Sequence, residues 1–581
     1  MAKKLTAFDY DGVASEGVFE DGSIIITGEP KERNEEIMET LGKKKATKIY
    51  NFPDDEEMNE KNKDAKIGIF KAKLIKSLGI KKFYEDTESE IQIIKEIAPE
   101  CEVIKVVDGV PIEPLNFIIF THSNTPILSI AEKLEKEGNR VILGVIEDSN
   151  KILLPDEESK PEPPDEKKTR LSLYTGIIDK YSADEVLKMA KRIKDKDEWI
   201  VLTDSNSNFQ YAEKMLDMGF TKGLFPTEED RSFECDRKKA KDFIKENYPD
   251  LKVAEVKTFK TIEEGIEFLN ESEDMWVLKS MGDSGTTICP NTEDPDIAKE
   301  EIIATLEEMQ KDYEENGFML EPRIIAPIEL TPEIIFNDGL PIMISLDIEI
   351  KTLAAGSAIQ TGCVLNLIVK TDFEDRINKI AFPEIVHEMA RKRKGLFAWD
   401  CSILIDKKGD MYFGEFCSQR FGYDSWCTEL AMSADDEGSK MVTPYFSSIL
   451  YKKNPLRKKF GVGVRIMNIG NGGKMVEGGT VQVGNDAISN TFLFEVKKEG
   501  DKIVSTNYCY DFGVVTSACD DLYEAIEKAY EYMDMVMFEG KYFRTDMASY
   551  EIPASIMKRY DYALNFGLIS SSESENEPKK S

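Results

Sequence analysis

Histidine is almost absent from this chain of 581 residues, which contains only His122 and His387. Chemistry must therefore rest on carboxylates, lysine and arginine, which transfer protons, bind metals or bind phosphate. Cysteine occurs nine times, but the cysteines are scattered and form no Cys-x-x-Cys pair. This pattern argues against a disulfide framework or a zinc site and is typical of reduced thiols in the cytosol.

Long apolar runs and excess positive charge are also missing. No stretch approaches the roughly 18 uninterrupted apolar residues of a membrane span, and Met1 to Lys4 lead into a predicted strand rather than into a signal-peptide core. The 76 Lys and Arg residues against 110 Asp and Glu residues leave a net charge of −34, which argues against nonspecific binding to nucleic acid or to an anionic membrane. We expect a large cytoplasmic enzyme that acts on small molecules.

A chain of this length predicts roughly three to five domains. Shifts in composition place them at 1–112, 113–230, 231–455 and 456–565, followed by a low-complexity tail at 566–581 that we expect to be disordered. The charged, proline-rich stretch 156–170 predicts a surface loop. In the second domain, the order strand, loop, helix, strand from Asn116 to Val145 predicts an open parallel sheet.

The first domain has polar residues at the ends of three predicted strands. The first strand, from Leu5, ends in Asp9-Tyr-Asp11-Gly12, and two carboxylates two residues apart after a strand can reach one cation. The second strand ends in Thr27, and the third ends in Glu85-Asp86. A lysine lies between them in Gly68-Ile-Phe-Lys71-Ala-Lys73.

In this order, the four segments resemble the motifs of haloacid dehalogenase-type phosphatases. The resemblance implies that Asp9 is the nucleophile on phosphorus and Asp11 the general acid and base. Thr27 and Lys71 are expected to hold the phosphoryl oxygens, with Lys73 as the alternative lysine. The implied magnesium ligands are Asp9, Asp11 and Asp86, with Glu85 as the alternative to Asp86. A structural domain without turnover is the competing interpretation.

An acidic hairpin is predicted from 397 to 417. If its turn centres between Lys407 and Lys408, Asp400 faces Glu415, and directly opposed side chains lie about 5 Å apart. Like charges repel at that distance, so the pair needs a cation, and magnesium binds through one or two carboxylates plus substrate phosphates. A solvated acidic hairpin is the alternative.

The segment that follows, Gly414-Glu-Phe-Cys-Ser-Gln-Arg-Phe-Gly422, resembles the metal-binding end of ATP-grasp ligases, and most closely that of phosphoribosylamine–glycine ligases. The resemblance implies that Asp400 and Glu415 bind metal and that Arg420 assists. Cys417 stands where that family has a metal-binding asparagine, and one extra residue precedes Arg420. Ser418 or Gln419 is the alternative oxygen ligand.

A nucleotide site is predicted upstream of this hairpin. Lys279 ends an apolar strand, and the loop that follows contains Gly282, Ser284 and Gly285. Glycine and small residues let backbone N–H groups approach phosphate oxygens, while lysine adds a positive charge. An ordinary hairpin loop is the alternative.

A second segment resembles the part of ATP-grasp ligases that contacts the adenine and ribose of the nucleotide. Segment 317–329 resembles the strand and hinge that hold adenine and ribose. This implies Glu321 at the adenine edge and Glu329 at the ribose hydroxyls, with Glu333 as the alternative.

These observations and resemblances predict a multidomain protein of α/β and α+β class. Its expected parts are a Rossmann-like phosphatase domain, an open-sheet domain, an ATP-grasp fold and a small C-terminal domain. The implied activity is an ATP-dependent carboxylate–amine ligase that acts through an acyl phosphate, with ATP and Mg²⁺ or Mn²⁺ as cofactors. The implied substrates are an amino acid or other carboxylate and a phosphorylated amine. A ligase for another phosphorylated nucleoside or sugar amine, and a nucleotide-binding protein without turnover, are the alternatives.

Overall fold

The computed structural model forms two compact units, Met1–Leu115 with Asp435–Lys453 and Asn116–Ala434 with Asn454–Ser581. It describes residues 5–53, 62–122, 126–146, 173–280, 287–290, 292, 294–311, 313, 317–324, 328–354, 360–419, 421, 424–435, 438–552 and 555–570. The predicted loop at 156–170 and residues 571–581 of the predicted tail lie outside these ranges. The expected tail begins too early, because Leu568 and Ile569 are buried and Ser570 N–H donates to Asp375. No helix within them is long and apolar enough to cross a membrane.

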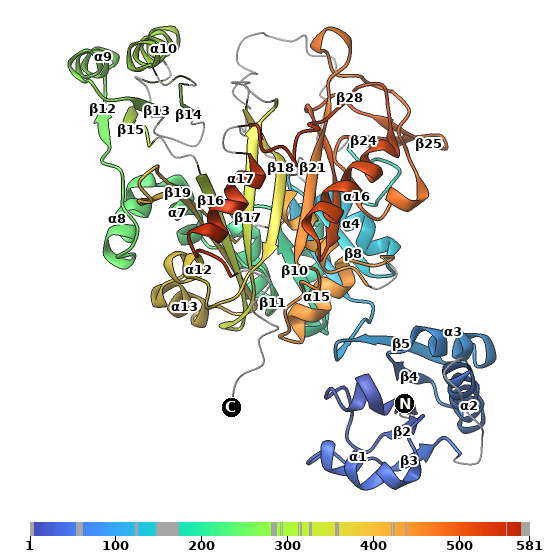
Figure 1. The fold of residues 1–581 in the computed structure, drawn as a ribbon. Coiled ribbons are helices and arrows are strands. Elements are labelled where there is room, and N and C mark those ends of the chain that lie inside the picture. Colours follow the sequence, from blue (N-terminus) through green and yellow to red (C-terminus); the bar gives the residue numbers. More distant parts are fainter. Residues whose placement is uncertain are drawn as a thin grey trace. The chain divides into compact units, whose positions relative to one another are not determined.

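The first unit contains a six-stranded sheet in the order β3-β2-β1-β4-β5-β6 (Figure 1). All neighbours are parallel except β5 and β6. The strands are β1 (Thr6–Phe8), β2 (Ile24–Thr27), β3 (Lys48–Asn51), β4 (Lys82–Glu85), β5 (Glu102–Val107) and β6 (Val110–Pro111). The helices are α1 (Asn34–Thr40), α2 (Lys63–Leu78), α3 (Glu88–Ile97) and α15 (Val442–Leu450).

Alternating apolar residues give this sheet two buried faces. Ala7 and Phe83 pack against α2 and α3, whereas their neighbours Phe8 and Tyr84 lie in a second cluster with α1. The sequence predicts that the first domain ends at residue 112, and the first segment of this unit ends nearby, at Leu115. It gave no sign that Asp435–Lys453 groups with the first unit. The domain limits remain predictions.

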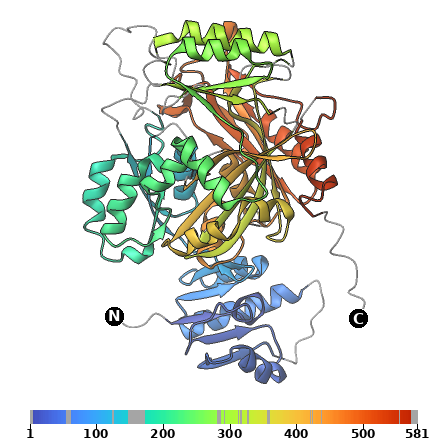
Figure 2. The same cartoon turned by 90° about the vertical axis from the view of Figure 1, so that its left-hand side faces the viewer.

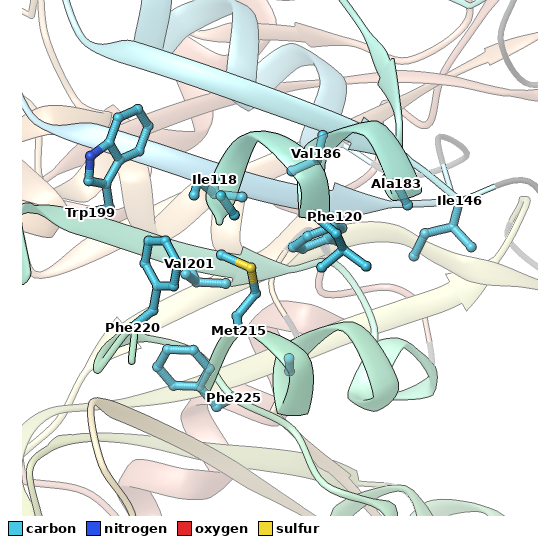
Figure 3. Packing of buried hydrophobic residues seen from close by; sticks show 13 residues of the cluster. Ile118, Phe120, Ile146, Ala183, Val186, Trp199, Val201, Met215, Phe220 and Phe225 are labelled. Atoms are coloured by element: carbon cyan, nitrogen blue, oxygen red, sulfur yellow. The ribbon is translucent and has the colours of Figure 1, made fainter. Parts of the chain in front are cut away.

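The second unit begins with the open parallel sheet that the sequence predicts, in the order β11-β10-β7-β8-β9. Its strands are β7 (Asn116–Thr121), β8 (Arg140–Val145), β9 (Tyr181–Ser182), β10 (Trp199–Thr203) and β11 (Lys222–Gly223), with helices α4 (Ile127–Lys136), α5 (Ala183–Ala190) and α6 (Phe209–Asp217). Figure 3 shows Val186 and Met215 packed against the sheet residues Ile118, Phe120 and Val201. Helices α5 and α6 therefore share one face of the sheet.

A four-stranded antiparallel sheet follows, in the order β12-β15-β13-β14. The strands are β12 (Lys257–Phe259), β13 (Trp276–Ser280), β14 (Thr287–Ile288) and β15 (Phe318–Pro322), and the helices are α9 (Ile262–Glu271) and α10 (Pro295–Glu308). Leu269 of α9 and Ile302 of α10 belong to one core with Leu278 and Leu320 of the sheet. In Figure 2 these helices, in light green, lie at the top of the view, over the short strands of this sheet.

The largest sheet has nine strands, in the order β20-β19-β16-β17-β18-β21-β26-β23, with β28 beside β21. The strands are β16 (Ile328–Asn337), β17 (Leu340–Thr352), β18 (Gln360–Lys370), β19 (Leu396–Ile405), β20 (Met411–Ser418), β21 (Phe460–Asn468), β23 (Thr491–Leu493), β26 (Asp511–Cys519) and β28 (Lys541–Tyr542). All its pairs are antiparallel. The sheet thus runs across the expected limit between 455 and 456.

The remaining elements of this unit are helices and short strand pairs. The helices are α7 (Glu228–Cys235), α8 (Arg237–Asn247), α12 (Arg376–Ala381), α13 (Glu384–Arg391), α14 (Asp424–Met432), α16 (Leu522–Asp534) and α17 (Ile556–Asn565). The pairs are β22 (Gln482–Val483) with β27 (Val536–Met537) and β24 (Val496–Glu499) with β25 (Lys502–Ser505).

The predicted register of the acidic hairpin is wrong. Ile405 pairs with Met411 because Asp406 closes the turn, its carboxylate accepting the N–H groups of Lys408 and Asp410 at 2.8 and 2.9 Å. A β-bulge then inserts an extra residue in β20 between Phe413 and Phe416.

The turn and the bulge each shift the pairing of β19 with β20 by one residue, and the two shifts add up along the hairpin. Asp400 therefore lies opposite Cys417 and not opposite Glu415.

Candidate functional site

The first unit contains a buried lysine surrounded by carboxylates. Lys71 Nζ lies 3.0 Å from Asp9 Oδ1, 2.7 Å from Glu85 Oε2 and 2.6 Å from Glu90 Oε2. All four side chains are at most 6% exposed. Burial alone lowers the pKa of Lys71, but the three carboxylates outweigh it and raise that pKa well above its ordinary value. The lysine is thus held as a cation inside the protein.

The strand order explains why these groups meet. Asp9 follows β1 and Glu85 ends β4, and these strands are parallel neighbours, so their carboxyl ends share one edge of the sheet. Lys71 lies on the buried face of α2 with Ile67 and Ile75, whereas Lys73 is exposed. The structure therefore favours Lys71 over Lys73.

Three carboxylates at this edge can hold one cation. Ligand atoms of Asp9, Glu85 and Asp86 lie within 4.8 Å of one another. Asp86 also packs against Gly12, where a Cβ atom would lie 1.9 Å from Asp86 Oδ2 and where φ is +63°. Any side chain at position 12 would therefore displace Asp86.

Two other residues predicted for this edge take different positions. Asp11 does not belong to the three-carboxylate group and is exposed. Its carboxyl group is nevertheless partly shielded from water, and this desolvation, followed by the neighbouring Glu29, raises the pKa of Asp11 to about 7. Thr27 is fully buried at the end of β2 and accepts the N–H of Glu29 at 3.1 Å. Burial also raises the pKa of Asp9, although the positive charge of Lys71 acts to lower it.

In the second unit, two lysines converge on one glutamate. Lys279 Nζ of β13 and Lys241 Nζ of α8 each lie 3.0 Å from Glu321 Oε2 of β15. Burial alone raises the pKa of Glu321, but Lys279 and Lys241 outweigh it and lower that pKa. The predicted residues Gly282, Ser284 and Gly285 lie outside the described part of the chain.

The sequence prediction missed Lys241. It lies on the buried side of α8 with Ala240 and Ile244. A lysine in register with apolar residues is the signal that would have identified it.

A second charged group lies around Glu329. Its Oε1 accepts hydrogen bonds from Lys351 Nζ at 3.2 Å and from Ser402 Oγ at 2.9 Å. Lys351 Nζ also lies 3.9 Å from Glu415 Oε1. Lys351 therefore links the predicted ribose carboxylate to one of the predicted metal carboxylates.

The predicted metal residues of the hairpin lie close enough to influence each other. Burial raises the pKa of Asp400 well above its ordinary value, and Glu415 raises it further, although the N–H of Cys417 donates to Asp400 Oδ1 at 2.6 Å. Glu415 itself is 61% exposed. The two residues belong to no group of three close metal-binding side chains within the described ranges. Arg420 lies outside those ranges.

A pocket opens beside Asp400 on the largest sheet. Its lining residues come from β16, β19, β20, the turn after β20 and α14, and they are Glu333, Ala398, Trp399, Asp400, Cys417, Ser418, Gln419, Ser425 and Trp426. Glu333, the alternative to Glu329 in the sequence, therefore lies in this pocket and not with Lys351.

Solved structures resemble this chain in fold. Phosphoribosylamine–glycine ligase from Thermotoga maritima is 18% identical, with a TM-score of 0.50, covering 74% of this chain and 99% of that one. Biotin carboxylase from Campylobacter jejuni, solved as a β-γ-ATP complex, is 14% identical, with a TM-score of 0.50, covering 77% of this chain and 99% of that one. No family model matches the sequence, and no curated protein matches it.

About three quarters of the chain therefore shares the fold of ATP-grasp ligases. The expectation of an ATP-grasp fold is confirmed at this level. The haloacid dehalogenase-like fold of the first unit remains a prediction.

Proposed function

We propose that the second unit is an ATP-dependent ligase that joins a carboxylate to an amine. The observation that carries the proposal is the convergence of Lys241 and Lys279 on Glu321, in a chain with the fold of ATP-grasp ligases. Two cations beside one carboxylate leave an excess of positive charge, which suits the phosphates of a nucleotide.

The residues present fit ATP with magnesium. Lys241 and Lys279 would bind the nucleotide, and Asp400 and Glu415 offer the one or two carboxylates through which Mg²⁺ usually binds beside substrate phosphates. Magnesium would neutralise negative charge on those phosphates. The contribution of the chain is positioning and electrostatic stabilisation.

The proposed reaction has two balanced steps. A carboxylate oxygen of the first substrate attacks the γ-phosphorus of ATP, and ADP leaves, which gives an acyl phosphate. The amine nitrogen of the second substrate then attacks the acyl carbon, and inorganic phosphate leaves as the amide forms and nitrogen loses a proton. An amino acid or other carboxylate and a phosphorylated amine are the proposed substrates.

The first test is binding. Saturating ATP with MgCl₂ should raise the melting temperature of the full-length protein, since a ligand at a hundred times its Kd adds about 2.7 kcal/mol of stability. The second test is ATP-dependent phosphate release across a panel of carboxylates paired with amines. Stabilisation without release for any pair would favour the nucleotide-binding alternative, and the absence of both would refute the proposal.

The Glu415→Gln variant tests the assignment of the metal carboxylate. It should abolish phosphate release with any confirmed substrate pair and leave the fold intact, because Glu415 is exposed. Asp400→Asn should behave similarly. If Glu415→Gln retained wild-type turnover, this carboxylate would not bind the metal.

We also infer that the first unit hydrolyses phosphomonoesters. The supporting observation is the placement of Asp9, Lys71, Glu85 and Asp86 at one edge of a parallel sheet. In the proposed reaction the Asp9 carboxylate attacks phosphorus, the alcohol leaves with a proton from Asp11, and water then releases phosphate with Asp11 as base. Asp9, Glu85 and Asp86 fit Mg²⁺, which would shield the phosphate charge.

The test uses the full-length protein and a generic phosphomonoester with MgCl₂. Asp9→Asn should abolish hydrolysis because it removes the nucleophile, whereas Lys73→Met, on the exposed side of α2, should not. Hydrolysis that survives Asp9→Asn would come from elsewhere. A folded wild-type protein without hydrolysis of any phosphomonoester would favour the structural interpretation of this unit.

A further inference from the structure

Strand β17 loses its regular pairing near its end. Its pairs with β16 stop at Asp347, and its pairing with β18 is irregular between Ile350 and Thr352. Lys351, which donates to Glu329, lies at this irregularity. Breaks of this kind re-aim a side chain and are common beside active sites. Carbonyl groups that leave a sheet ladder in the protein interior need donors from elsewhere.

Two side chains from the C-terminal region donate to β17 after the irregularity. Arg544 Nη1 donates to the carbonyl and hydroxyl oxygens of Thr352 at 2.8 and 3.0 Å. The hydroxyl group of Tyr542 donates to the carbonyl oxygen of Leu353 at 3.2 Å. Arg544 is 5% exposed, and Asp546 accepts hydrogen bonds from its Nε and Nη2 at 2.8 and 2.7 Å. The C-terminal region thus supplies donors where the ladder of β17 is incomplete.

A third donor, Arg559 of α17, reaches β17 before the irregularity. Helix α17, in red in Figure 1, packs along β17. Arg559 Nη1 donates to the carbonyl oxygen of Glu349 at 2.8 Å, two residues before Lys351. Burial alone raises the pKa of Glu329, but the charges of Lys351 and Arg559 outweigh it and lower that pKa. Two cations from distant parts of the chain therefore hold Glu329 as a carboxylate.

We propose that Arg559 is a positioning residue for recognition of the nucleotide ribose. It fixes the backbone of β17 that presents Lys351, and it helps Lys351 to keep Glu329 ionised and oriented. Lys351 and Ser402 both donate to Oε1 of Glu329, so Oε2 faces the ribose hydroxyl groups, and an ionised carboxylate accepts stronger hydrogen bonds than a protonated one. The proposal rests on the proposed nucleotide site and on the predicted role of Glu329 at the ribose.

A role in folding alone would give a different result. If Arg559 only anchored α17, its loss would weaken the binding of every nucleotide to the same extent. A positioning role at Glu329 affects the ribose contact alone. The proposed phosphate-binding residues Lys241 and Lys279 belong to α8 and β13 and not to β17, so they should stay in place. A nucleotide that lacks the ribose hydroxyl groups therefore separates the two roles.

The probe is 2′,3′-dideoxy-ATP, which keeps the base and the phosphates of ATP and lacks both ribose hydroxyl groups. Calorimetry of the full-length wild type with MgCl₂ should show that ATP binds at least about tenfold more tightly than the probe, because hydrogen bonds to a charged group are strong. Saturating ATP should protect the amides of Lys351 to Leu353 and of α17 from hydrogen–deuterium exchange more than the saturating probe does. Equal protection by the two nucleotides would overturn the proposal without any variant.

Arg559→Met should reduce the preference for ATP over the probe at least about fivefold, by weakening ATP binding and leaving probe binding unchanged. Arg559→Lys keeps the charge and should retain most of the preference. The matched control is Lys133→Met on α4, because Lys133 Nζ also donates to two backbone carbonyls of the same unit, those of Ile488 and Ser489. It should leave the preference unchanged. A wild-type preference in Arg559→Met, or equal weakening of both nucleotides, would overturn the proposal.

Glu329→Gln separates failure of this proposal from failure of the proposed function. If Glu329→Gln loses the preference for ATP but Arg559→Met keeps it, the ribose site stands and the role of Arg559 is wrong. If the wild type binds ATP and the probe equally, Glu329 does not contact the ribose, so the role of Arg559 is wrong while nucleotide binding stands. If the wild type binds neither nucleotide, the ligase proposal fails and this proposal fails with it.

Discussion

Replacing Lys71 with methionine would expose how strongly the first unit depends on one buried cation. Methionine keeps most of the volume but removes the charge, so Asp9, Glu85 and Glu90 lose their shared partner at 2.6 to 3.0 Å. Removing one member of a buried ion pair costs about 3–5 kcal/mol. Folded proteins have only about 5–15 kcal/mol of stability in total. The substitution should therefore remove a large part of the stability of this unit.

Hydrogen–deuterium exchange measures this loss in the first unit alone. A destabilisation of about 3 kcal/mol should accelerate exchange of the slowest amides of β1, α2 and β4 roughly 150-fold, since about 1.4 kcal/mol corresponds to a factor of ten. The matched control is Lys73→Met on the same helix, which is exposed and should change stability by less than about 0.5 kcal/mol. Equal exchange in the two variants would refute the reasoning.

A second substitution checks the cause. Adding Glu90→Gln to Lys71→Met removes one of the three stranded carboxylates, and it should recover part of the lost protection. If the double variant were less protected than Lys71→Met alone, the loss would come from packing and not from uncompensated charge.

Three further predictions concern both units. Lys241→Met should weaken ATP-magnesium binding about tenfold to a hundredfold by calorimetry, because a hydrogen bond to a charged group contributes about 1.5–3 kcal/mol, whereas the exposed Lys238→Met should not. Burial raises the pKa of Glu495 from 4.5 to about 7, so as the pH rises Glu495 loses its proton in the unfolded chain before it does so in the folded one. This group therefore lowers the free energy of unfolding progressively between pH 4.5 and 7, by up to roughly 3 kcal/mol. The Glu495→Gln variant should melt at a higher temperature than wild type at pH 8 but not at pH 4. Asp9→Asn should leave ATP-dependent ligation unchanged, since Asp9 and the nucleotide lysines belong to different units, and loss of ligation in a folded variant would reveal coupled sites.

Some of the site followed from pattern alone. The polar ends of β1, β2 and β4 were predictable because parallel strands present their carboxyl ends at one edge. The choice of Lys71 over Lys73 was also available, because Lys71 follows Ile67 by four residues and precedes Ile75 by four, in helical register with the buried face. The ATP-grasp fold was predicted from the resemblance of short segments to ATP-grasp ligases, and the solved structures support this fold.

Other features depended on geometry that no local pattern contains. The register of the acidic hairpin was set by the side chain of Asp406 inside the turn and by the bulge in β20, and each moved the pairing by one residue. The pocket at Glu333 depends on α14 folding over the sheet. Such long-range packing cannot be read from the spacing of residues along one strand.

The segment Asp435–Lys453 has a consequence for how the protein is made. The chain crosses between its two units after residues 115, 434 and 453, so they are joined at three points and not by one linker. Synthesis proceeds at about 5–20 residues per second, and more than 300 residues separate Leu115 from Lys453. The N-terminal sheet therefore waits roughly 17 to 68 s on the ribosome before α15 emerges to complete its unit.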